Sequence, residues 1–189
     1  MNDFGKYFAP PYALDLTKRE RVETWYRNAR YFIMASILLT GLFTFLSLVN
    51  PHPFLLTLTI PHTLIVWGFL SSGRAPTGIV EAYAENGFTV SVRGDSTFTF
   101  ALVAALFVLF LFFVCWYRSK DYHVGWLVGA LVLMLLDTVA MFVIHGFSPF
   151  GVVFHGGILI ILLIGIRAHF RLKKMPPDHP NLIPLDDLK

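Results

Sequence analysis

The sequence has little charge and almost no cysteine. Only 14% of its 189 residues are Asp, Glu, Lys or Arg, while 56% are hydrophobic. Soluble globular domains usually carry roughly a quarter of charged residues. This composition excludes an ordinary soluble domain and predicts an integral membrane protein. Because Cys115 is the single cysteine, an intrachain disulfide is also excluded.

The chain also lacks the motifs of common enzyme classes. It has no HExxH or CxxC pair and no glycine-rich phosphate loop. Its first two apolar segments contain no histidine, which argues against bis-histidine haem ligation, and its membrane serines lie in no glycine-flanked elbow. The net charge of +3 comes from basic residues that flank the apolar segments. We therefore expect a non-catalytic protein with no cofactor and no nucleic-acid partner.

Four apolar segments are long enough to cross a membrane. They cover residues 29–49, 99–117, 124–145 and 150–167, each near the about 20 residues that a helix needs for a ~30 Å hydrocarbon core. A fifth stretch, 54–70, carries Pro61 and His62 at its centre, and its alternation of Thr with Leu and Ile is typical of strands. We expect strands at 54–60 and 63–70, with a fifth membrane segment as the alternative.

The placement of basic residues favours four spans over five. With four spans, 13 of the 15 Lys and Arg residues lie on one side of the membrane. With five spans they divide almost equally. Because basic residues favour the cytoplasmic side, both termini are predicted to be cytoplasmic. The predicted order is a cytoplasmic tail with an interfacial helix (1–28), the first span (29–49), an outer segment (50–98), the second span (99–117), an inner loop (118–123), the third span (124–145), an outer turn (146–149), the fourth span (150–167) and a cytoplasmic tail (168–189).

The outer segment has the pattern of a small sheet. Asn86 and Gly87 provide a type I′ turn between two strand-like runs in residues 79–95. A lone hairpin is only marginally stable, so three or four packed strands are expected. The predicted fold is an all-α membrane protein, a four-transmembrane-helix bundle with a small non-cytoplasmic β-sheet segment between the first and second spans.

The two cytoplasmic ends are expected to lie at the membrane surface. Thr17 and Glu20 have the spacing of a capping box, so a helix should begin there and run unbroken into the first span. Basic and aromatic side chains around it are typical of an interfacial anchor, with a partner-binding or lipid-specific helix as the alternative. The predicted anchoring residues are Arg19, Arg21, Trp25, Arg27, Arg30, Arg171, Lys173 and Lys174.

The third and fourth spans carry the candidate site. Asp137 and His155 lie at similar expected depths on helices joined by a short turn, and a carboxylate in hydrocarbon must face a donor. We predict that they pair, either as a clamp between two helices or as a protonatable site that lines a water-filled cavity. A metal site is a third interpretation, which requires Asp137, His155 and His145 to converge with His52 or His62 from the outer segment.

Two functions of different classes follow from these features. The first is a small non-catalytic membrane protein, an accessory or scaffold subunit that binds other membrane proteins or copies of itself through its outer β segment and basic cytoplasmic ends. The second is a proton- or ion-coupled transporter or channel subunit that uses Asp137 and His155. Four spans with few buried polar groups offer little material for a substrate path, which favours the first function.

Overall fold

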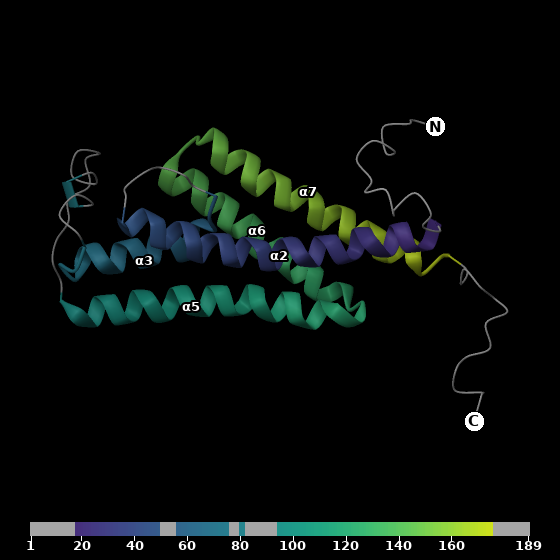
Figure 1. Ribbon diagram of the computed structural model, residues 1–189, viewed down its shortest axis with the longest axis horizontal. Helices are drawn as coiled ribbons and strands as arrows, with labels where there is room; N and C mark the ends of the chain where they lie inside the picture. The colour runs from purple at the N-terminus through teal and green to yellow at the C-terminus, as the bar shows by residue number, and fades with distance from the viewer. Residues whose placement is uncertain (1–17, 50–55, 76–79, 82–93, 176–189) are drawn as a thin grey trace, which may run out of the picture.

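The computed structural model of this chain describes residues 18–49, 56–75, 80–81 and 94–175 (Figure 1). Within these ranges the chain is helical, and none of them contains a β-strand. The elements are α2 (Lys18–Val49), α3 (Thr59–Ser71), α5 (Asp95–Arg118), the short 3-10 helix η2 (Ser119–Asp121), α6 (Val124–His145) and α7 (Pro149–Leu172).

Four of these helices are long and apolar enough to cross a membrane, as the sequence predicted. The candidate spans are Arg19–Val49, Asp95–Asp121, Val124–His145 and Pro149–Leu172. Large apolar side chains on their outer faces are exposed, among them Phe45, Phe107 and Val143. On helices of this length and hydropathy, such a surface suits contact with lipid. The chain is therefore a multi-pass membrane protein associated with the bilayer.

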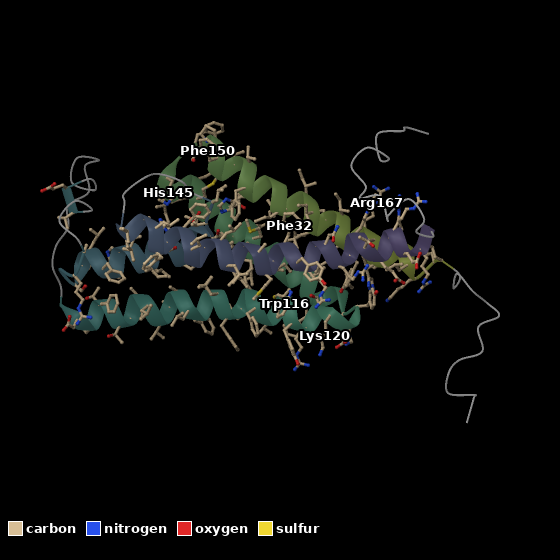
Figure 2. The ribbon with its side chains drawn as sticks, viewed as in Figure 1. Phe32, Trp116, Lys120, His145, Phe150 and Arg167 are labelled. Carbon is tan, nitrogen blue, oxygen red and sulfur yellow. The ribbon has the colours of Figure 1, made fainter. Side chains whose placement is uncertain are left out.

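The four long helices form one bundle with two distinct ends. We call the end where α2 begins, α5 meets α6 and α7 finishes the basic end (Figure 1). Arg167 and Lys120 lie toward it, whereas His145 and Phe150 lie toward the opposite end (Figure 2). The sequence predicts that the basic end is cytoplasmic.

Helix α2 runs unbroken for 32 residues, as predicted from the sequence, and packs closely against α7. A Cβ atom added at Gly165 of α7 would overlap the Cβ of Ala29 on α2, so the glycine allows the two backbones to approach. The beginning of α2 is tied to the bundle as well. The Tyr26 hydroxyl donates to the Ser119 carbonyl at 2.8 Å. Thr17, the expected capping residue, lies outside the described residues.

Two of the predicted anchoring arginines bind within the protein. Arg19 Nε lies 3.2 Å from the Glu23 carboxylate, and Arg30 Nε donates to the Ser119 hydroxyl at 3.1 Å. Arg30 therefore ties α2 to η2, and Arg19 ties it to the residues after α7, because its Nη1 atom also donates to the Met175 carbonyl at 3.1 Å. Arg21, Trp25 and Arg27 on α2, and Arg171, Lys173 and Lys174 later in the chain, are exposed, and their role at a membrane surface stays a prediction.

Helix α3 lies where the sequence predicted strands, and that prediction is wrong. Residues Thr59–Ser71 form a helix of 13 residues. Pro61 falls in its first turn, where a missing N–H costs no intrahelical hydrogen bond. At about 1.5 Å per residue the helix is roughly 20 Å long, too short to cross a ~30 Å core. It is neither a strand nor a fifth span.

Instead, α3 begins inside the bundle and runs beside α5 toward the end that lies away from the basic end (Figure 1). Gly68 lets it come close to α5, since an added Cβ would lie 2.9 Å from the Cβ of Ala101. The Phe69 and Phe98 rings meet edge to face at 4.9 Å. The first turn of α3 is thereby placed among α2, α6 and α7. The hairpin predicted around Asn86 and Gly87 lies outside the described residues.

Candidate functional site

The centre of the site is Asp137, a fully buried carboxylate on α6. Its Oδ2 atom accepts a hydrogen bond from the backbone N–H of Thr59 at 2.7 Å, and its Oδ1 atom accepts one from Ile60 at 2.8 Å. These are the first two residues of α3. The residue in the N-cap position, Leu58, has no side chain that can cap. Asp137 therefore caps α3 from another helix. The positive end of the α3 dipole also stabilises a negative charge at this position.

The remaining donors near the start of α3 are satisfied too. The Leu58 N–H donates to the Thr40 hydroxyl of α2 at 2.8 Å, and that hydroxyl donates to the Ser36 carbonyl at 2.7 Å. Pro61 has no N–H, and the His62 N–H reaches the Leu58 carbonyl at 3.2 Å. A helix that begins inside a membrane protein must have its first donors satisfied, because hydrocarbon supplies no acceptor. Side chains of α2 and α6 meet this requirement.

His155 of α7 completes the arrangement. Its Nε2 atom lies 2.9 Å from Asp137 Oδ2, and its Nδ1 atom lies 2.9 Å from the Gly151 carbonyl oxygen. Because a carbonyl only accepts, Nδ1 carries a proton. The contact between Nε2 and Oδ2 then requires one further proton, shared by an imidazole and a carboxyl group. The pair as a whole is electrically neutral, which suits a buried position.

Of the other candidate histidines, His62 belongs to α3 and His145, the last residue of α6, lies beside α3. The His62 Nδ1 atom is 3.0 Å from the Thr44 hydroxyl of α2, and the His145 Nε2 atom is 3.5 Å from the Thr63 hydroxyl. Each ring thus has a threonine partner. Within the described ranges, no three His, Cys, Asp or Glu residues come close enough to hold a metal ion. His52 lies outside those ranges.

The pair is buried, and neither of the two cavities found among the described residues reaches it. Both side chains are about 1% exposed. A cavity of about 720 Å³ lies at the basic end, and a groove of about 220 Å³ lies between α2 and α7. Neither Asp137 nor His155 lines either space. The geometry can hold α3, α6 and α7 together. Neither of the two openings gives water a path to the pair.

Sequence reasoning brought Asp137 and His155 to similar depth and missed what the carboxylate does. The structure adds Thr40, Thr59 and Ile60 to the site. Pro61 was an available signal, since proline is common in a first helical turn and rare inside a sheet. No local signal pointed to Asp137 as the cap, because the two partners are 78 residues apart.

Comparison with known proteins gives no match, whether by family model, by curated protein or by solved structure. Function must therefore be argued from the residues and their geometry.

Proposed function

We propose that this chain is a small non-catalytic integral membrane protein, an accessory or scaffold subunit, in which Asp137 and His155 form a structural clamp. The observation that supports this proposal is the use of the Asp137 carboxylate as the cap of α3. In discontinuous helices of transporters, the first turn of a half-helix faces the anionic group of a substrate. Here the protein's own carboxylate occupies that position.

The second candidate function is a proton-coupled transporter or channel subunit. It is favoured by the single proton shared between His155 Nε2 and Asp137 Oδ2, and by the two further histidines beside α3. Such a function needs water at the pair during some part of a cycle. The closed surroundings of the pair favour the clamp.

Proton flux into liposomes separates the two functions. The full chain would be reconstituted with a pH-sensitive dye inside, and acidification would be followed after a pH step with valinomycin and potassium present. For a clamp, wild type and Asp137→Asn should acidify no faster than protein-free liposomes. Asp95→Asn is the matched control, because the Asp95 side chain is 74% exposed at the start of α5. A flux that wild type and Asp95→Asn share and folded Asp137→Asn lacks would establish the proton-coupled function instead.

The accessory role requires a protein partner or self-association. We propose that other membrane proteins, or further copies of this chain, bind at the basic end and along the lipid-facing helices. After cross-linking in intact membranes and purification in mild detergent, the chain should be recovered with a partner in fixed stoichiometry or as a defined oligomer. Recovery of the chain as an isolated monomer would contradict the scaffold function.

We further propose that the basic end is cytoplasmic, as the positive-inside rule predicts. Cys115 is buried, so single added cysteines can be compared directly. A cysteine at exposed Lys120 should be protected from an impermeant maleimide in intact cells, and one at exposed Phe147 should react. The reverse labelling pattern would invert the topology.

A further inference from the structure

A second polar region lies far from the clamp, at the basic end of the bundle. There the beginning of α2, the end of α5, the beginning of α6 and the end of α7 surround an open cavity of about 720 Å³.

The side chains around the cavity carry an excess of positive charge. Arg19, Arg118 and Lys173 line it, against one carboxylate, Glu23. Glu23 is already bound by Arg19 at 3.2 Å. Among the described residues, Arg118 and Lys173 form no ion pair, and both are exposed. An anion in the cavity would therefore meet two cations that no carboxylate of the described chain neutralises.

The beginning of α6 adds a second source of positive potential. Its first turn, including Gly125, lines the cavity. The N-cap residue His123 makes no side-chain hydrogen bond to this turn, and the turn contains no acidic residue. A Cβ added at Gly125 would meet nothing within 4 Å, so the backbone is open to a close approach. Uncapped helix N-termini attract anions through their N–H groups and the helix dipole.

An independent observation comes from His169 of α7. This residue lines the cavity although it is only 5% exposed. Its Nε2 atom is buried and has no hydrogen-bond partner among the described residues. Buried polar atoms in folded proteins are nearly always paired, with protein groups, water or a ligand. The nitrogen is shielded from the cavity, so a ligand atom reaches it, and supplies the missing partner, only after a small rotation of the His169 ring.

We propose that this cavity binds a phosphate group, held by Arg118, Lys173, His169 and the first turn of α6. Tyr122 and Trp126 also line the cavity, and aromatic residues of this kind are enriched where lipid headgroups lie. The phosphate available at the end of a transmembrane bundle is that of a phospholipid. The basic residues around the cavity match those of anionic-lipid sites between transmembrane helices. The proposal is independent of the clamp and of the scaffold function.

Native mass spectrometry of the full chain in mild detergent can test the site. Phosphatidylglycerol is the probe, and phosphatidylcholine is the zwitterionic control. We expect wild type to bind the anionic lipid roughly tenfold more tightly, a difference that about two charge-assisted contacts can produce. The double variant Arg118→Gln with Lys173→Gln should lose this preference. The matched control, Arg167→Gln with Arg171→Gln, removes the same charge from exposed positions of α7 that do not line the cavity, and should keep it.

Two further variants separate a built site from general surface charge. Gly125→Phe fills the cavity without changing the charge and should lower anionic-lipid binding as much as the double variant does. His169→Leu removes the unpaired nitrogen, so the melting temperature of the lipid-free protein should stay unchanged or rise. The same variant should bind phosphatidylglycerol more weakly. Equal loss of lipid preference in the Arg118/Lys173 and Arg167/Arg171 pairs would overturn the proposal, as would wild-type binding by folded Gly125→Phe.

The source of the phosphate is decided by competition. Inorganic phosphate at millimolar concentration should not displace phosphatidylglycerol if the site is made for a lipid. Displacement by inorganic phosphate in wild type would keep the phosphate site and assign it to a soluble phosphate compound.

Discussion

The two polar regions of this bundle differ in how completely their hydrogen-bonding groups are used. At the start of α3, the carboxylate of Asp137 and the hydroxyl of Thr40 accept every available backbone donor from residue 58 to residue 60. At the basic end, a buried histidine nitrogen has no partner among the described residues and exposed cations surround a cavity. Completed networks hold structure together, whereas incomplete ones leave capacity for a ligand. This contrast predicts that mutations in the two regions affect different properties.

The largest loss of stability is expected from Asp137→Leu. This change removes the acceptor of two backbone N–H groups and of His155 in a single step. Breaking a buried charged network in this way typically costs about 3–5 kcal/mol. Thermal unfolding in detergent should show a large drop in melting temperature, or no folded protein. Asp95→Leu removes an exposed carboxylate and serves as the control; an equal drop for both variants would contradict the capping role.

The next effect is an asymmetry between the two members of the pair. His155→Leu leaves Asp137 still bound to the Thr59 and Ile60 N–H groups, so it should destabilise the protein less than Asp137→Leu does. In the double variant those two N–H groups stay without an acceptor, and stability should not return to the wild-type value. Residues in contact should nevertheless couple by about 0.5 kcal/mol or more in a double-mutant cycle. Full recovery in the double variant would show that the pair, rather than the cap, carries the stability.

Part of this arrangement could be predicted from the sequence. The four spans could be predicted because each is a long apolar run, and this signal is local. The contact between Asp137 and His155 could be predicted because a short turn fixes the relative depth of neighbouring helices. The helical state of residues 59–71 could not, because Thr and Leu alternate there as in a strand while the cap that stabilises the helix comes from α6. Tertiary contacts overrode local propensity at this position.

The basic end shows a related limit. Eight residues at this end were predicted to anchor the chain at a membrane surface, a reading that treats arginines as equivalent. In the structure Arg30 binds Ser119 of η2, and Arg19 and Lys173 line the cavity together with Arg118, which was not among the eight. Which cations line the cavity depends on how four helix ends pack together. This arrangement cannot be predicted from a short stretch of sequence.

A moderate effect is expected at the third donor of the α3 start. Thr40→Val keeps the shape of the side chain and removes the acceptor of the Leu58 N–H, which should cost about 1–3 kcal/mol for a buried donor left unpaired. Thr138→Val is the matched control, because the Thr138 hydroxyl only donates to the Met134 carbonyl of its own helix. The two melting temperatures should therefore differ, with Thr40→Val the lower. Equal values would show that the buried Leu58 N–H finds another acceptor.

The smallest effect on stability is expected at the basic end. Arg118→Gln with Lys173→Gln removes two exposed cations that form no ion pair with the described residues, so the free energy of unfolding should change by only about 0.5 kcal/mol. The melting temperature of the lipid-free protein should stay close to the wild-type value, and the stabilisation that added phosphatidylglycerol provides should disappear. If this variant instead unfolded as readily as Asp137→Leu, the basic end would be part of the structural framework, and the division between a closed region for structure and an open one for ligand would fail. Comparing the two variants with and without lipid tests that division directly, because only a ligand site loses a lipid-dependent shift while its lipid-free stability is retained.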